Sequence, residues 1–181
     1  MRTCEICGRS IVAKNAQARF CSSNCRVTAH RRAKRLTLPE ELTSRNRWIR
    51  HSAEKKPVDA ITGATASSTD PSTWATYAEA DTSPHGAGLG FVLGDGIACI
   101  DLDHVITDEE LHPAAAELVS HYPSNYIEVS PSGTGLHIWG LSPERPGTRR
   151  IENGISVERY SSGRYITITK NVYQAGTLLP L

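Results

Sequence analysis

The segment GIACIDLD, residues 96–103, decides the fold that we expect, because an apolar run ends there in two closely spaced carboxylates. Residues two apart on a β-strand face the same side of a sheet, so Asp101 and Asp103 are predicted to project side by side. Neighbouring carboxylates repel each other, and near pH 7 a cation normally relieves that repulsion. The segment therefore predicts a buried strand that ends at a divalent-metal site. In the alternative interpretation, one carboxylate ends a turn and the other pairs with an arginine.

Apolar runs separated by turn residues predict further strands around this segment. The glycine turn at residues 94–96 joins it to the run at residues 88–93, and we expect these two strands to form a hairpin. The same reasoning predicts strands at residues 126–129, 136–141, 157–160 and 165–169, the last two again as a hairpin.

Two helices are predicted between these strands. One starts at Pro71, after the capping residue Asp70, and runs to near Asp81. The other covers residues 114–121 and ends before a proline. Strands in hairpins combined with two helices predict an α+β fold with a largely antiparallel sheet.

Glu158 is the candidate for a third carboxylate at the metal site. It alternates with Val157 and Arg159 in a predicted strand, so it can face the site while those neighbours face away. Arg164 starts the return strand and can lie close to Glu158. The pair is either a cross-strand ion pair or a metal ligand beside a phosphate contact.

The loop SPSGTG, which precedes His137, has the composition of an anion-binding turn. Gly133 and Gly135 allow backbone N–H groups to approach an anion closely, and Ser132 and Thr134 add hydroxyl donors. We expect this loop and His137 to bind a triphosphate. The alternative is a surface turn with a structural histidine.

Four of the five cysteines lie near the N-terminus, as Cys4-x2-Cys7 and Cys21-x3-Cys25 with thirteen residues between the pairs. Two close pairs at this separation are typical of a tetrahedral zinc site. Two disulfides are the rival interpretation, but nothing in the sequence indicates export.

Charge is distributed unevenly along the chain. Residues 1–50 hold 12 Lys and Arg against 3 Asp and Glu, whereas residues 51–181 hold 8 against 16. The basic side chains gather after the cysteines, in a predicted helix, at Arg26, Arg31, Arg32, Lys34 and Arg35. This pattern predicts contacts with nucleic-acid phosphates, and a solvated basic surface is the alternative.

These features divide the chain into a zinc-binding basic module at residues 1–35, a linker at residues 36–46 and a catalytic core at residues 47–181. No apolar run is long enough to span a membrane, and the first residues do not form a signal peptide. We therefore expect a cytoplasmic protein that has no membrane partner.

The order of motifs resembles the catalytic core of the archaeo-eukaryotic primase superfamily, in particular phage- and plasmid-encoded primase-polymerases. The motifs are hydrophobic-Asp-x-Asp at residues 100–103, Ser-x-x-Gly-x-Gly-x-His at residues 130–137 and hydrophobic-Glu at residues 157–158. The resemblance covers about residues 40–175.

The resemblance implies an RRM-like core that transfers nucleotides from NTP or dNTP to a 3′-hydroxyl in phage or plasmid DNA replication. Asp101, Asp103 and Glu158 would hold two Mg²⁺ or Mn²⁺ ions, and His137 would contact the triphosphate. Ser132 and Arg164 would orient the phosphates. The implied partners are a single-stranded DNA template, the nucleotides and a helicase on a separate chain, in a bacterial or phage-infected cell.

Members of that family commonly carry a helical or helicase segment after the core. Since the sequence stops at Leu181, elongation is a firmer expectation than de novo priming. Two other functions stay open. The chain can be a non-catalytic zinc-finger adaptor for nucleic acid, or a metal-dependent nuclease or nicking initiator with Tyr160 as its nucleophile.

Overall fold

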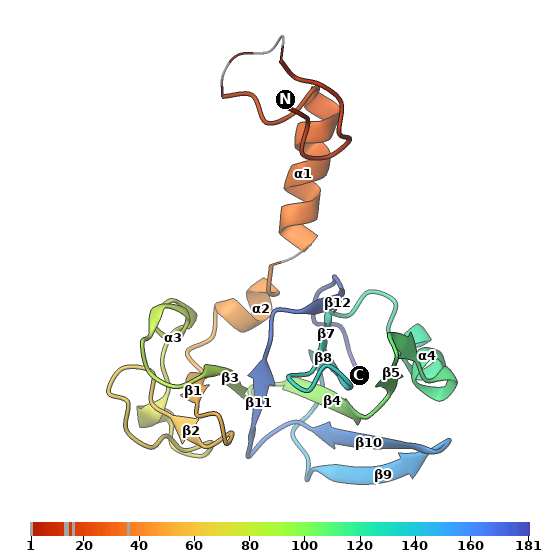
Figure 1. Cartoon of the computed structure of the whole chain (residues 1–181). Helices are drawn as coiled ribbons and strands as arrows, with labels where there is room; N and C mark the ends of the chain where they lie inside the picture. The colour runs from red at the N-terminus through yellow and green to blue at the C-terminus, as the bar shows by residue number, and fades with distance from the viewer. Residues whose placement is uncertain (1, 13–14, 16, 36) are drawn as a thin grey trace. The chain divides into compact units, whose positions relative to one another are not determined.

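The computed structural model describes the backbone of residues 2–12, 15, 17–35 and 37–181, with their side chains except those of residues 30–35. The chain forms two compact units, Met1–Thr37 and Leu38–Leu181, called here the first and the second unit. Figure 1 traces both along the chain. None of the helices in the described ranges combines the length and the apolar character that a membrane crossing needs.

The first unit consists of a cysteine-bearing loop region and one helix. An antiparallel bridge joins Thr3 to Ser10 in the loop region. Helix α1 spans Ser23–Arg35. The Ser22 hydroxyl accepts a hydrogen bond of 3.2 Å from the backbone N–H of Cys25, which stabilises the start of the helix as a capping interaction does.

The second unit contains two main sheets, and all neighbouring strands in them are antiparallel. The four-stranded sheet has the order β11 (Tyr165–Ile168), β3 (Gly88–Val92), β1 (Trp48–His51) and β2 (Pro57–Val58). The six-stranded sheet has the order β12 (Val172–Gln174), β7 (Ile127–Val129), β8 (Leu136–Leu141), β4 (Ile97–Asp103), β10 (Ile155–Tyr160) and β9 (Thr148–Glu152). In Figure 1, β1, β2 and β3 lie to the left of β11, and β4, β8 and β10 lie to its right.

Short elements complete the second unit: the strand pair β5 (Ile106–Thr107) and β6 (Glu110–Leu111), and the helices α2 (Glu40–Thr43), η1 (Pro71–Thr73), α3 (Tyr77–Thr82) and α4 (Pro113–Ser120). Helices and mostly antiparallel sheets confirm the predicted α+β class, and α4 confirms the predicted second helix.

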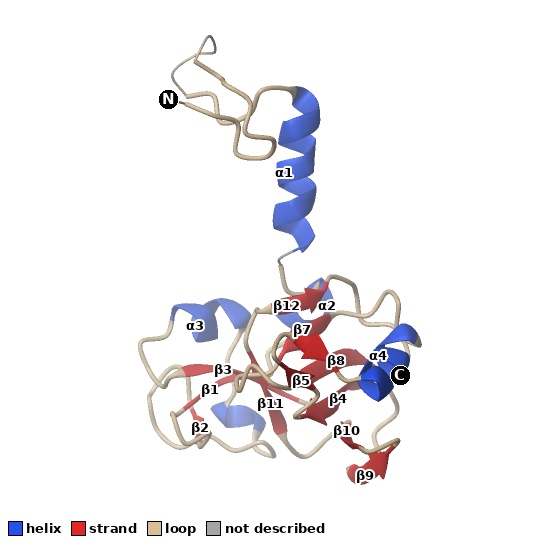
Figure 2. Ribbon diagram, turned by 45° about the vertical axis from the view of Figure 1, so that its right-hand side comes forward, coloured by secondary structure: helices blue, strands red, loops and turns tan. Residues whose placement is uncertain are grey.

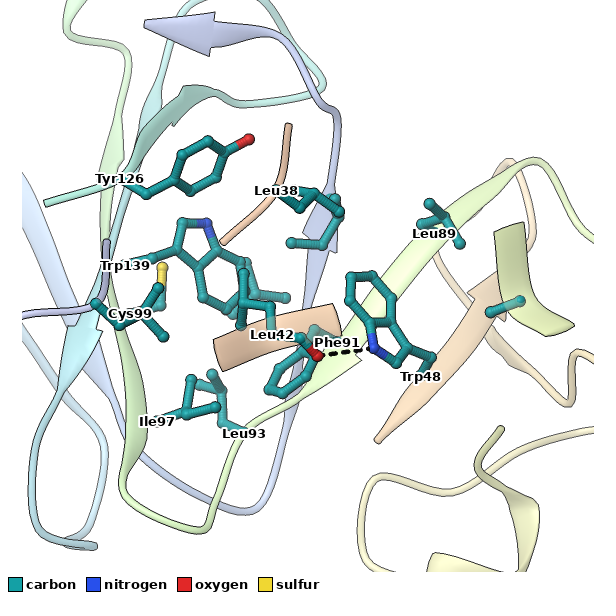
Figure 3. Close-up of a cluster of buried hydrophobic side chains, with 14 of the residues drawn as sticks. Leu38, Leu42, Trp48, Leu89, Phe91, Leu93, Ile97, Cys99, Tyr126 and Trp139 are labelled. Carbon is teal, nitrogen blue, oxygen red and sulfur yellow. Dashed lines mark hydrogen bonds between the residues drawn. The ribbon is translucent and has the colours of Figure 1, made fainter. Parts of the chain in front are cut away.

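The two main sheets pack against each other through a buried apolar cluster. Phe91 of β3 meets Trp139 of β8 edge to face, with ring centroids 6.0 Å apart. Figure 3 shows Leu42 of α2 in the same cluster, where its carbonyl oxygen accepts a hydrogen bond of 3.1 Å from the indole N–H of Trp48. Burial of each large side chain in such a cluster stabilises the fold by roughly 1.5–3 kcal/mol.

Helix α4 covers the opposite face of the six-stranded sheet. Ala115 and Val119, one helical turn apart, pack with Ile100, Leu102 and Ile138. Figure 2 shows α4 beside β8 and β4. Both faces of β4 are therefore covered, which explains why its sequence is an uninterrupted apolar run before Asp101.

Neither predicted hairpin forms. Strands β3 and β4 belong to different sheets, as do β10 and β11. The turns between them carry the chain from one sheet to the other. Asp95 in the first turn and Gly163 in the second have positive φ angles of 52° and 74°, which permit such sharp changes of direction. Sequence periodicity identifies strands but not their partners, which explains the error.

The prediction of one continuous helix from Pro71 to Asp81 is also wrong, because the segment forms two separate helices, η1 and α3. Ala75 is extended and exchanges two backbone hydrogen bonds with Trp48, of 3.1 and 2.8 Å. Helix α3 then starts afresh, with Thr76 as the N-cap of a capping box whose other member is Glu79.

Part of the expected linker belongs to the second unit. Leu38 and Leu42 are buried in the cluster between the sheets. The physical reason is that burial of these two apolar side chains is favourable, so the segment that carries them packs against the sheets and is not an exposed linker.

Candidate functional site

Five polar side chains form a row across the six-stranded sheet, one from each of five neighbouring strands. The pairing register places Glu128 opposite His137, His137 opposite Asp101, Asp101 opposite Glu158, and Glu158 opposite Arg149. Directly opposed residues on neighbouring strands share one face of the sheet. We call these five side chains the polar row. It brings together Asp101, His137 and Glu158, three of the residues that the sequence analysis singled out.

The members of the polar row are close to one another. The Nδ1 atom of His137 lies 3.4 Å from Oε1 of Glu128, and its Nε2 atom lies 3.6 Å from Oδ1 of Asp101. At the other end, Nε of Arg149 lies 2.9 Å from Oε1 of Glu158. Glu128 is 0% exposed, His137 3% and Glu158 8%. These three side chains are therefore largely withdrawn from water, whereas the Arg149 side chain is exposed. Electrostatic interactions between buried groups are stronger than those at the surface.

The environment of Asp101 disfavours its charge. Burial raises the pKa of Asp101, and the charges of Asp103 and Glu158 raise it further, against the opposing influence of His137 and Arg164. Asp103 lies two residues along the same strand, opposite Ser156 of β10. A cation between these carboxylates would relieve their repulsion.

Glu158 has several partners in the structure. Besides Arg149, it accepts a short hydrogen bond from the Tyr160 hydroxyl, and Nη1 of Arg164 lies 3.9 Å from its Oε2 atom. The Arg164 guanidinium lies 3.9 Å from the centre of the Tyr160 ring, as in a cation–π contact. Arg164 is thus close to Glu158 as expected, although no hairpin joins them.

The carboxylates are near one another without forming a tight cluster. Within the described residues, three or more His, Cys, Asp or Glu ligand atoms gather within 4.8 Å of one another only at the four N-terminal cysteines. Contacts with Arg149 and Tyr160 hold the Glu158 carboxylate in its orientation. Glu158 would have to break these contacts to come closer to Asp101 and Asp103.

A cleft of about 360 Å³ opens beside the polar row, between the two main sheets. Asp101, Asp103 and His137 line one side, and residues 164–167 of the β11 segment line another. Lys55 and residues 130–132 complete the wall. Cationic, anionic and hydroxyl groups thus converge on one hollow, as in sites that bind charged small molecules.

The glycine-containing loop is held by its own hydrogen bonds. The Gly135 N–H donates to the Ser130 hydroxyl at 3.1 Å, and the Gly133 N–H donates to the Ser130 carbonyl at 2.9 Å. These bonds use the two N–H groups that we expected to face an anion. A Cβ at Gly135 would lie 2.5 Å from the Leu102 carbonyl, so the glycine permits close packing against β4.

The hydroxyl groups of this loop form a chain. The Ser132 hydroxyl lies 3.0 Å from that of Ser130 and 2.9 Å from that of Thr134. The Thr134 hydroxyl is also 3.4 Å from Nδ1 of His104, the residue after Asp103. Ser132 and His104 line the cleft, so hydroxyl and ring nitrogen donors are available there in place of the glycine N–H groups.

The sequence analysis did not single out Glu128, Lys55 or Tyr165, which belong to this region. Glu128 is fully buried behind His137, and the other two line the cleft. A lone acidic residue in the apolar strand at 126–129 is a signal that could have identified Glu128. Nothing local in the sequence distinguishes Lys55 or Tyr165, which reach the cleft only through the packing of the sheets.

The four N-terminal cysteines gather in the first unit. Sulfur atoms of Cys7, Cys21 and Cys25 lie 3.4, 3.5 and 3.7 Å apart in pairs, and the Cys4 sulfur joins them within 4.8 Å. A disulfide needs about 2.05 Å between sulfurs. A zinc tetrahedron with bonds of about 2.3 Å has edges of about 3.8 Å. All five cysteines of the chain are free, so the rival disulfide interpretation has no support.

Backbone groups also favour a thiolate at one member of this group, Cys4. Burial raises the pKa of Cys4, but hydrogen bonds from the backbone of Cys21, Ile6 and Cys7 more than offset burial and lower it to about 6. The chemistry of four sulfur donors at these spacings fits zinc.

The basic segment forms helix α1, as the sequence predicts. Arg26 is exposed on it. The side chains of Arg31, Arg32, Lys34 and Arg35 lie outside the described residues, so the structure does not place them.

Comparison with known proteins gives one informative match. The chain is 39% identical over 136 residues to a DNA primase-polymerase of Nitratiruptor phage NrS-1. The match covers 70% of this chain and 19% of the phage protein, so the chain spans about a fifth of that relative's length. No family model matches the chain.

Proposed function

We propose that the chain transfers nucleotides to a nucleic-acid 3′-hydroxyl on a template, as a primase-polymerase in phage or plasmid DNA replication. One observation carries this proposal. Asp101, Asp103 and His137 line one polar cleft together with the loop that precedes His137. Glu158, from a separate part of the chain, lies opposite Asp101 on the neighbouring strand. The identity with a phage primase-polymerase supports it.

Asp101, Asp103 and Glu158 are the proposed ligands of two Mg²⁺ or Mn²⁺ ions. Carboxylate oxygens are the ligands that these hard cations prefer, and the raised pKa of Asp101 indicates a carboxylate that a cation would stabilise. The bound ions would activate the attacking hydroxyl and offset charge on the leaving pyrophosphate. Arg149 and Tyr160 hold the Glu158 carboxylate in the row, and the carboxylate would leave these contacts to act as a metal ligand.

The nucleotide is proposed to bind in the cleft. Arg164 and His137 provide cationic or N–H contacts for its phosphates, and Ser132 and Thr134 provide hydroxyl donors. Gly133 and Gly135 shape the loop that carries these hydroxyls. Lys55 adds a further positive charge at the wall of the cleft.

The first unit is proposed to bind zinc and nucleic acid. Cys4, Cys7, Cys21 and Cys25 would hold one structural Zn²⁺. The zinc would stabilise a unit in whose described part few apolar side chains are buried. Arg26, Arg31, Arg32, Lys34 and Arg35 would contact phosphates of a single-stranded DNA template. The proposed partner is a helicase on a separate chain, and the proposed location is the cytoplasm of a bacterial or phage-infected cell.

Primer extension tests the proposed activity. The full chain, single-stranded template with primer, Mg²⁺ or Mn²⁺ and labelled nucleotides should yield extended products. Asp101→Ala should reduce incorporation more than about a hundredfold, because the loss of a metal ligand removes several kcal/mol of transition-state stabilisation. Template binding, measured by fluorescence anisotropy, should change little.

Glu117→Ala is the matched control, since Glu117 is an exposed carboxylate on α4. It should retain full incorporation. If the folded wild-type chain yields no product with either metal, or if Asp101→Ala is as active as the control, the proposal is wrong.

A further inference from the structure

We propose that a pocket on the α4 side of the six-stranded sheet binds a nucleoside phosphate, at a site separate from the cleft beside the polar row. The pocket has a volume of about 400 Å³, which lies within the range of sites that hold small molecules. We call it the arginine pocket, because Arg145, Arg150 and Arg159 line it. The inference goes beyond the proposed nucleotide transfer and does not depend on it.

The arginine pocket and the polar row lie on opposite faces of the six-stranded sheet. Arg159 of β10 is opposite Ile100 of β4, whereas the polar row contains the neighbouring residue on each strand, Glu158 and Asp101. Successive residues of a strand point to opposite faces. Ile100 packs in the apolar cluster under α4, so Arg159 belongs to the α4 side. A ligand in this pocket is therefore on the other side of the sheet from the proposed metal ligands.

The charges that line the pocket favour an anion. Residues 51–181 hold 8 Lys and Arg against 16 Asp and Glu, yet three of those basic residues line this one pocket. The lining contains one carboxylate side chain, Glu152, and each of its oxygens accepts a hydrogen bond from Arg159, at 2.6 and 3.0 Å. In the described part of the chain, Arg145 and Arg150 have no carboxylate partner within 4.0 Å. An anion would supply the opposite charge that these two guanidinium groups lack.

Arg145 is held in place by two buried serines. Its Nη2 atom donates a hydrogen bond of 2.9 Å to the Ser142 hydroxyl, and its backbone N–H donates one of 2.9 Å to the Ser161 hydroxyl. The Ser161 hydroxyl donates in turn to the Arg145 carbonyl oxygen at 3.2 Å. Guanidinium groups bind phosphate through paired N–H donors, and a guanidinium that is already positioned loses less entropy on binding. The other N–H groups of Arg145 are thus prepared for an oxyanion such as phosphate.

The remaining lining fits a flat organic group. Ala98 and Ile100 of β4 supply apolar surface, and Tyr122, just after α4, supplies an aromatic residue. Aromatic side chains stack on nucleobases of any kind. Guanidinium groups beside apolar and aromatic surface match a phosphate that is linked to a nucleoside better than a bare phosphate. Free nucleotides and the nucleotides of a DNA strand share this chemistry, and the test below distinguishes them.

Titration of the full chain with AMP, followed by ¹H–¹⁵N NMR without added Mg²⁺ or Mn²⁺, tests the site. We expect saturable shifts of the backbone signals of Ala98 and Ser161, which line the arginine pocket. AMP should bind there about tenfold more tightly than inorganic phosphate, because the base adds a stacking contact. Equal affinities for AMP and phosphate, or shifts confined to Ser130 and Ser132 of the cleft, would overturn the proposal.

Two substitutions identify the phosphate contacts. Arg150→Gln and Arg145→Gln should each weaken AMP binding at the arginine pocket about tenfold, because each removes a hydrogen bond from a charged donor. Arg149→Gln is the matched control. Arg149 is exposed and precedes Arg150 on β9, but it lies opposite Glu158, on the other face of the sheet. The control should leave the affinity at this pocket unchanged. If both test variants bind AMP as tightly as the control, the proposal is wrong.

A short single-stranded DNA oligonucleotide identifies the source of the ligand. If it shifts the same signals and binds more tightly than AMP, the site takes a nucleotide of a strand. If it binds more weakly than AMP, the site takes a free nucleotide, and either result supports the site. None of these measurements uses primer extension. A chain that incorporates no nucleotide would therefore refute the proposed function, while the signals of Ala98 and Ser161 still decide whether the arginine pocket binds.

Discussion

Buried ionisable groups of the second unit concentrate in the polar row. Glu128, His137 and Glu158 are each less than 9% exposed, and each has an oppositely charged or hydrogen-bonding partner in the row. Burying a charge is costly unless it is paired, so such groups persist where pairing is good or where function needs them. Burial raises the pKa of Asp101, at the centre of the row, so the charged form of this carboxylate is disfavoured.

Asp101→Asn should therefore stabilise the second unit while it abolishes the proposed activity. A carboxyl group whose pKa is higher in the folded than in the unfolded chain reduces stability once both states are ionised, at neutral pH. The amide removes that penalty, and we expect the midpoint of thermal unfolding to rise by about 2–4 °C at pH 7. Scanning calorimetry without added Mg²⁺ or Mn²⁺ measures it.

The sign of the pH dependence gives a second readout. As pH falls from 7 through the raised pKa of Asp101, the folded carboxyl takes up a proton, and the difference between wild type and variant should shrink. Glu117→Gln, at an exposed carboxylate, should show no such difference. A lower midpoint for Asp101→Asn at pH 7 would contradict this interpretation of the site.

At the scale of elements, hydrogen bonds made by single residues decide where the segments begin and end. Ala75 pairs with Trp48 and interrupts what periodicity alone predicts as one helix. The turns at residues 94–96 and 161–163 pass the chain between sheets, and so bring β11 and Arg164 to the cleft opposite β4. The cleft is thus a product of strand pairing between distant segments.

Thr76→Ala should reduce the free energy of unfolding by about 1 kcal/mol, the usual cost of a lost N-cap. The Thr76 hydroxyl accepts the backbone N–H of Glu79 at 3.2 Å, and the Glu79 carboxylate binds the backbone N–H of Thr76 at 2.9 Å. Urea denaturation followed by tryptophan fluorescence measures the change. Thr76→Ser, which keeps the cap, should remain near wild type, and equal stability of both variants would show that the cap does not hold α3.

At the scale of the whole molecule, the two units differ in how they are stabilised. The second unit has two apolar clusters on the two faces of its six-stranded sheet. In the described part of the first unit, the buried apolar side chains are Cys4 and Ile11. Small units of this kind usually need a metal or disulfides, and the cysteines here are free.

Removal of zinc should therefore unfold the first unit and leave the second intact. We expect one Zn²⁺ per chain by atomic absorption, and loss of helical circular dichroism from α1 after chelation. All three tryptophans, Trp48, Trp74 and Trp139, belong to the second unit, so their emission should not change. Cys7→Ser should lose the metal, whereas Cys99→Ala, at a buried cysteine of β4, should keep it. A metal-free chain with an unchanged α1 would contradict the zinc assignment.

Local chemistry made much of this protein predictable. The α+β class, the strands 97–103 and 136–141, helix α4 and the approach of the four cysteines all follow from spacing and periodicity, because each depends on neighbours a few residues away. The resemblance to the primase superfamily implied that Asp101 and Glu158 share a site, and the register places them directly opposite each other.

The amino-acid sequence by itself determined which segments become strands and which side chains carry charge, since both are properties of short stretches of chain. Only the tertiary structure decided which strands pair, that Glu128 lies behind His137, and that Lys55 and Arg164 reach the same cleft. The physical reason is that strand pairing and sheet packing join residues far apart in the chain, and no local pattern encodes which distant partner buries the most apolar surface.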